Sequence, residues 1–149
     1  MELMDEINQH VNDTARALLI NMAHAIGKEM PVPERRTSGE GPYGECWTNA
    51  WELAMSDDTL RYCEGVCTYA HPLKQPRHHA HAWVVDLNGF VIDPTESYQH
   101  SYAYRGFILR KDEVERATAD WDGPRSSVVE CLFAAGQSVP QIIARFVEA

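Results

Sequence analysis

Hydrophobic side chains recur at helical spacing in two segments of the first third of the chain. Between residues 5 and 27 the apolar positions are Ile7, Val11, Leu18, Leu19, Met22 and Ile26. In the second segment the apolar positions are Trp47, Ala50, Trp51, Ala54 and Met55, which follow the helical spacing i, i+3, i+4, i+7 and i+8. This spacing puts the apolar side chains of each segment on one face, so both segments are predicted to be amphipathic helices.

The segment between these helices is predicted to be a loop, because residues 31–44 contain three prolines and three glycines. Loops of this length inside a compact domain are usually functional or disordered. This one leads directly to Cys46, at the start of the second predicted helix.

The middle of the chain changes to short β-type segments. Strands are predicted at 60–70, at "HAWVVD" (81–86), at "FVIDPT" (90–95) and at "YRGFILR" (104–110), with a turn region at 71–79. Helices return at 111–120 and in the tail, where Ser127 with Glu130, and Ser138 with Pro140, are residue types that begin helices. With no repeat and no linker, residues 1–149 are predicted to form a single α+β domain.

Composition and charge restrict the classes of function. The 13 Lys and Arg against 22 Asp and Glu give a net charge of −9, which repels phosphate backbones, so we expect no nucleic-acid partner. No stretch approaches the roughly 18–20 apolar residues of a membrane span, and the acidic N-terminus differs from a secretory signal. We therefore expect a cytoplasmic protein without a membrane partner. In that reducing compartment its four cysteines would be thiols.

Cys46 is the candidate nucleophile. A thiol attacks a carbonyl as the thiolate, and the unpaired N–H groups and positive dipole end in the first turn of a helix favour that anion. The same N–H groups are suited to hold the oxyanion of a tetrahedral intermediate. Such a nucleophile needs a base and a group that orients the base, and the segment from His81 to Asp93 offers both.

The register of the predicted hairpin decides whether His81 and Asp93 can meet. A two-residue turn at the Asn-Gly pair would direct them to opposite faces. A three-residue turn at 87–89 would place Trp83 opposite Asp93, with His81 as its diagonal neighbour on the same face. We favour this register because Asp86 and Gly89 are the residue types that the turn requires. The other, apolar face would then carry Ala82, Val84, Phe90 and Ile92.

These strings resemble the transglutaminase-like branch of the papain-like thiol enzymes. The resemblance spans roughly residues 41–96: a cysteine at a helix start, "HAW" at a strand start and "DPT" ending the next strand. "YCEGVC" followed by "HAWVVDLNGFVIDPT" is similar to strings in small bacterial and phage-encoded members. The resemblance implies a helix N-terminus packed on a short antiparallel sheet with flanking helices. It also implies a triad with Cys46 as nucleophile, His81 as general base and acid, and Asp93 as orienter.

The chain departs from this family in two ways. Papain-type peptidases have an upstream Gln whose side chain completes the oxyanion hole, and no Gln lies between residues 10 and 74. Backbone N–H groups, Tyr43 or another loop group would then take that role. The chain is also short for an extended peptide cleft.

Four further residues are predicted to lie at the substrate site, and the loops 31–45 and 71–79 to flank it. They are Tyr43, Asn49, His79 and Trp83. Trp83 is alternatively a shield for the ion pair or a core residue, and Glu64 points into the cleft or to water. The negative net charge favours neutral or basic substrates.

The predicted function is cysteine-dependent acyl transfer through a thioester, without a cofactor, on a peptide, a protein or a small amide or ester. Hydrolysis makes the protein a peptidase or amidase, and transfer to an amine makes it an acyltransferase; the triad alone does not separate them. One alternative is a non-catalytic binding module with the same fold. Another is a zinc site made from Cys63, Cys67, His71 and the histidines at 78–81.

Overall fold

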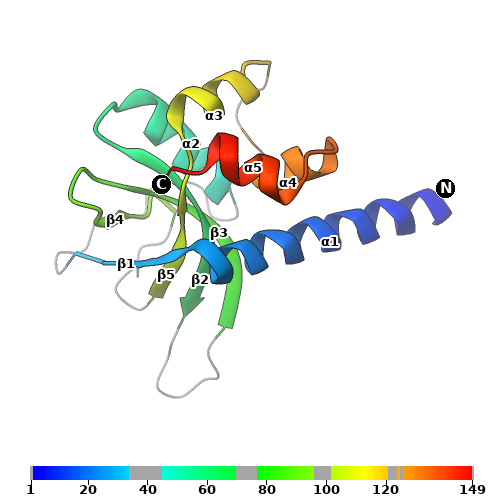
Figure 1. Cartoon of the computed structure of the whole chain (residues 1–149). Helices are drawn as coiled ribbons and strands as arrows, with labels where there is room; N and C mark the ends of the chain where they lie inside the picture. Colours follow the sequence, from blue (N-terminus) through cyan, green and yellow to red (C-terminus); the bar gives the residue numbers. More distant parts are fainter. Residues whose placement is uncertain are drawn as a thin grey trace.

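The computed structural model of the protein describes residues 2–33, 45–69, 77–95, 102–120, 124 and 126–148. Within them the chain has a mixed α+β architecture, as predicted (Figure 1). The helices are α1 (Glu2–Ile26), α2 (Cys46–Ser56), α3 (Lys111–Ala117), α4 (Val128–Ala134) and α5 (Val139–Phe146). The strands are β1 (Lys28–Met30), β2 (Arg61–Tyr69), β3 (Arg77–Val85), β4 (Val91–Ile92) and β5 (Tyr102–Ile108).

The strands form one antiparallel sheet in the order β1-β5-β2-β3-β4. The sheet curls so that its two edges approach each other. The N–H of Val91, in edge strand β4, donates at 2.9 Å to the carbonyl of Pro31, the residue after edge strand β1. Gly65 and Gly106 lie opposite each other on β2 and β5, and a Cβ on Gly106 would come within 2.3 Å of the Glu64 carbonyl oxygen. The absence of both side chains therefore lets these two strands approach closely.

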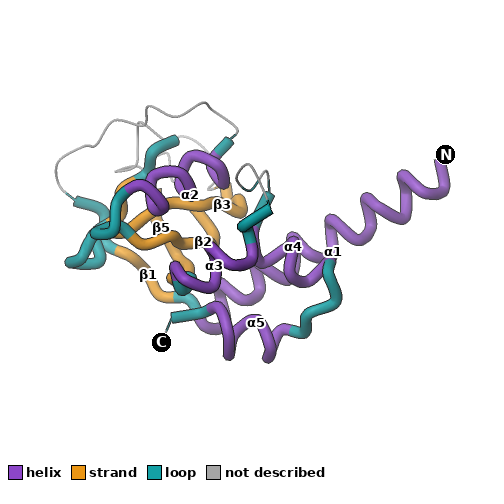
Figure 2. Tube along the Cα trace, turned by 90° about the horizontal axis from the view of Figure 1, so that it is seen from above, coloured by secondary structure: helices purple, strands orange, loops and turns teal. Residues whose placement is uncertain are grey.

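The helices pack on the outer face of the curled sheet, with α4 beside α1 and α5 beside α4 (Figure 2). Side chains from this outer face and from the helices form the larger hydrophobic core, which includes Leu19, Ala50, Val84 and Phe146. The inner face has a smaller core of its own. It consists of Cys63, Cys67, Trp83, Val85, Val91 and Tyr104. None of the described helices is long and apolar enough to cross a membrane.

Three segments differ from the sequence predictions. β3 begins at Arg77, so residues 77–79 of the predicted turn region are in a strand that pairs with β2 along its whole length. β4 is limited to two residues, and β1 was not predicted because it lies between a helix end and a proline-rich loop. Phe90, predicted to be on the apolar face, is 39% exposed because it closes the hairpin turn.

Candidate functional site

The hairpin between β3 and β4 has the three-residue turn that the sequence favoured. Val84 pairs with Ile92 and Val85 with Val91, and the Asp86 N–H donates to the Phe90 carbonyl at 3.0 Å. Gly89 has φ +83°, in the left-handed region that glycine enters without strain. This register sets Asp93 opposite Trp83, on the same inner face of the sheet as His81.

His81 and Asp93 form a buried hydrogen-bonded pair. The distance from His81 Nε2 to Asp93 Oδ2 is 2.8 Å, and the two residues are 3% and 0% exposed. Asp93 Oδ2 also accepts from the Tyr104 hydroxyl at 2.7 Å, and Oδ1 accepts from the Thr95 N–H at 2.9 Å. Burial raises the pKa of Asp93, but the hydrogen bonds from His81, Tyr104 and Thr95 and the charge of His81 outweigh it and lower this pKa below its ordinary value.

Cys46 is the first residue of α2 and contacts His81. Burial lowers the pKa of His81, but its hydrogen bonds to Asp93 and Cys46, and the charges of both partners, raise this pKa to about 10. Because Asp93 occupies Nε2, Nδ1 is the ring nitrogen left for Cys46. Hydrogen bonds therefore connect Cys46 to His81 and His81 to Asp93, so the three residues lie together as predicted from the sequence.

No family model, curated protein or solved structure matches this chain.

Asn49 ties the helix that carries Cys46 to the segment that carries Asp93. Its side-chain amide is buried and donates to the Thr95 hydroxyl at 2.8 Å. Thr95 in turn donates its backbone N–H to Asp93. Asn49, predicted to contact substrate, thus also holds α2 and Asp93 at a fixed separation.

Aromatic rings surround His81 on the inner face. Trp83 stacks on it with ring centroids 6.2 Å apart, and Tyr104 packs edge-on against Trp83 at 5.1 Å. Trp83 is fully buried, so it has no surface for a substrate and shields the ion pair instead. His79 packs edge-on against His81 at 5.3 Å and is half-buried. Tyr43 lies outside the described residues.

The other cysteines lack comparable surroundings. Burial raises the pKa of Cys63 far above its usual range, and it also raises the pKa of Cys131. Cys63 and Cys67 point into the inner core. Of the described residues, which exclude His71, no three or more His, Cys, Asp or Glu are arranged to hold a metal ion.

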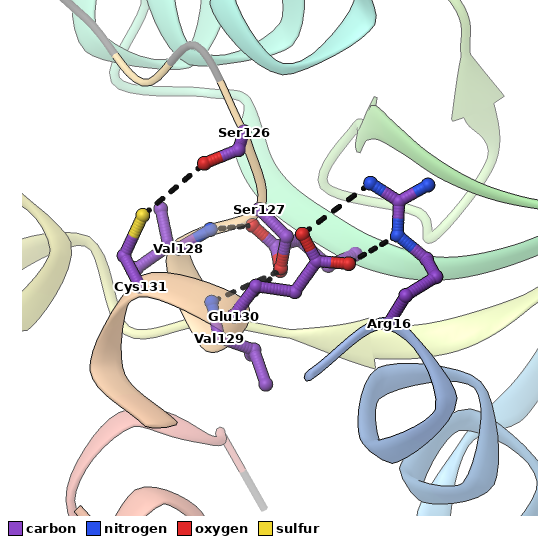
Figure 3. Close-up of polar contacts among 8 residues, drawn as sticks. Arg16, Ser126, Ser127, Val128, Val129, Glu130 and Cys131 are labelled. Atoms are coloured by element: carbon purple, nitrogen blue, oxygen red, sulfur yellow. Dashed lines mark hydrogen bonds and ion pairs between the residues drawn. The ribbon is translucent and has the colours of Figure 1, made fainter. Parts of the chain in front are cut away.

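Two charged groups near the site make contacts that the sequence did not predict. Glu64, expected in the cleft or in water, is fully buried and accepts hydrogen bonds from Tyr62, Ser127 and the Val128 N–H, so it binds the start of α4. Arg16 of α1 forms an ion pair with Glu130 of α4 (Figure 3). Except for the bond between Tyr62 and Glu64, these contacts join residues 63 or more positions apart, so no local sequence pattern predicts them.

Proposed function

We propose that the protein is a cytoplasmic, cysteine-dependent acyl-transfer enzyme with a papain-like, transglutaminase-like triad of Cys46, His81 and Asp93. The observation that carries this proposal is the buried 2.8 Å bond between His81 and Asp93, with Cys46 beside the same imidazole at a helix start. An imidazole with a raised pKa stays protonated near neutral pH and favours the thiolate of a neighbouring cysteine.

The reaction begins when Cys46 Sγ attacks the carbonyl carbon of an amide or ester. N–H groups in the first turn of α2 are suited to receive the negative charge that develops on the carbonyl oxygen. His81 then gives its proton to the leaving amine or alcohol, and a thioester to Cys46 remains. Water or an amine attacks this thioester, His81 takes the proton of the attacking group, and Cys46 is released as thiolate. The substrate is a peptide, a protein or a small amide or ester.

The test is the pH dependence of Cys46 alkylation by iodoacetamide, followed for each cysteine by peptide mass spectrometry. Cys46 is expected to react well below pH 8, faster than Cys131. His81→Ala and Asp93→Asn are expected to slow it, whereas His79→Ala, two residues away on the same face, serves as the matched histidine control. If Cys46 reacts like an ordinary thiol and His81→Ala changes nothing, the enzyme proposal is wrong. A non-catalytic binding module then replaces it.

A further inference from the structure

A cavity of about 450 Å³ lies between α1 and α4. It is lined by Asp13, Ala15, Arg16, Ser126, Glu130, Cys131 and Ala134. Two of the lining residues, Arg16 and Glu130, form an ion pair, and the hydroxyl of a third, Ser126, lies 3.2 Å from Cys131 Sγ (Figure 3). The triad does not use any of these side chains.

The guanidinium of Arg16 is held by one of its edges. Its Nε donates to Glu130 Oε1, and its Nη2 donates to Oε2 at 3.3 Å. A guanidinium has five N–H donors, and within the described part of the chain no acceptor takes the two on Nη1. The Arg16 side chain is 44% exposed, whereas that of Glu130 is 11% exposed. Glu130 therefore holds one edge of the guanidinium and leaves Nη1 for another acceptor.

Arg16 also lies close to the nucleophile. Its guanidinium carbon is 5.6 Å from the centroid of the Trp47 ring, and Trp47 is the residue after Cys46. The hydrogen bond to Glu130 is the main reason for the raised pKa of Arg16, and the charge of Cys46 contributes to it. The positive charge of Arg16 also helps to lower the pKa of His79, after burial and the charge of His81.

We propose that Arg16 binds a carboxylate of the substrate, and that the cavity between α1 and α4 receives the part of the substrate that carries it. This inference rests on the proposed function and names its substrate class: amides or esters with a carboxylate near the bond to be cleaved, such as short peptides with a free C-terminus. A guanidinium fork matches a carboxylate with two parallel hydrogen bonds. The net charge of −9 favours neutral or basic substrates in general. Of the side chains described around this cavity, Arg16 is the one with a positive charge, and it lies there with the carboxyl groups of Asp13 and Glu130.

The experiment compares alkylating probes that differ only in charge. Iodoacetyl-glycine and iodoacetyl-glycylglycine are each used with a free carboxylate and with a carboxamide end, so that two distances from Cys46 are sampled. In the wild-type protein one carboxylate probe is expected to alkylate Cys46 about tenfold faster than its carboxamide partner, as one charge-assisted hydrogen bond implies. Arg16→Gln is expected to abolish this preference, which is measured within each variant as the ratio of the carboxylate rate to the carboxamide rate. Glu130→Gln, which removes the competing carboxylate, is expected to increase it.

Arg145→Gln is the matched control, because Arg145 also pairs with a glutamate, Glu113, and lies 5.2 Å from the centroid of the Phe146 ring. Alkylation is assigned to each cysteine by mass spectrometry, since Cys131 lines the same cavity. Circular dichroism checks the fold. If Arg16→Gln unfolds, Arg16→Lys decides, with an expected severalfold loss of preference because lysine keeps the charge but not the fork.

The outcomes separate the two proposals. If the carboxamide probe alkylates Cys46 no faster than an ordinary thiol, the proposed function fails. If that probe is fast but the carboxylate brings no advantage, or if Arg16→Gln keeps the advantage, the role of Arg16 is overturned and the proposed function stands.

Discussion

Tyr104→Phe tests whether Asp93 must be held in place for Cys46 to react. The Tyr104 hydroxyl donates to Asp93 Oδ2 at 2.7 Å, the same oxygen that receives His81 Nε2. Without the hydroxyl, the described donors to this carboxylate are His81 and the Thr95 N–H, and the carboxylate is freer to rotate away from His81. The imidazole then loses its fixed orientation toward Cys46.

The chain contains a matched control for this substitution. Tyr62 is also 1% exposed and also donates to a buried carboxylate at 2.7 Å, that of Glu64, which is not part of the triad. A buried hydrogen bond to a charged group contributes about 1.5–3 kcal/mol. Both Tyr104→Phe and Tyr62→Phe should therefore lower the free energy of unfolding by about 2 kcal/mol. For a chain of this length that corresponds to a fall in Tm of about 6 °C.

The two variants should differ in the reactivity of Cys46. Tyr104→Phe is expected to slow alkylation by iodoacetamide at pH 7 about tenfold, a loss of about 1.4 kcal/mol in the activation barrier. Tyr62→Phe should leave the rate within about twofold of wild type. Thermal unfolding and rate measurements on the same preparations separate the two effects. Equal stability loss with equal alkylation rates would refute a positioning role for Tyr104.

Three further predictions concern the pH response and the fold. In a Cys46→Ala background, which leaves His81 paired with Asp93 alone, the pair should stabilise the protein fully between pH 3.8 and pH 6.5, the ordinary pKa values of aspartate and histidine. It should do so progressively less as the pH rises toward the raised pKa of His81. Urea unfolding with and without Asp93→Asn checks this, and a difference that stays constant across that range would contradict it. Ser127→Ala should destabilise the protein by about 2–3 kcal/mol and Ser138→Ala by about 1 kcal/mol, because Ser127 caps α4 and also binds buried Glu64, whereas exposed Ser138 only caps α5. Urea unfolding measures both losses, and equal losses would be inconsistent with a contribution from Glu64. Gly106→Ala should lower the free energy of unfolding by about 3 kcal/mol in the same assay, because its Cβ would meet the Glu64 carbonyl. Gly89→Ala should lower it by about 1 kcal/mol, because its Cβ meets nothing within 4 Å but the residue has a positive φ. The reverse order would argue against a close approach of β2 and β5.

The geometry of the proposed triad was predictable because it depends mainly on local features. The face on which Asp93 lies follows from a three-residue turn, and Asp86 and Gly89 encode that turn within four positions of each other. The start of α2 at Cys46 likewise follows from a glycine-rich loop that gives way to a helical pattern. Short-range turn and helix signals of this kind are carried by neighbouring residues.

The supporting contacts were not predictable because they depend on how distant elements pack. Tyr104 reaches Asp93 only because the inner face of the curled sheet brings β5 and the end of β4 together. Arg16 meets Glu130 across 114 positions of sequence, and Glu64 meets Ser127 across 63. The side chains of charged residues are ordinarily assigned to solvent in a sequence, and a buried carboxylate such as that of Glu64 violates that rule.

The burial of the pair also bears on why the chain keeps it. His81 and Asp93 lie among Trp83, Val91 and Tyr104 on a face that is otherwise a small hydrophobic core. A buried ion pair is often neutral or unfavourable for stability compared with well-packed apolar residues of similar volume. The desolvation of both groups opposes their ionised forms here, and it is offset by their mutual attraction and by three polar groups around them, those of Cys46, Tyr104 and Thr95. Stability alone therefore gives no reason to place a charged pair at this position. The proton-transfer role that we propose beside Cys46 does, because it requires an imidazole that is held in one orientation and kept charged at neutral pH.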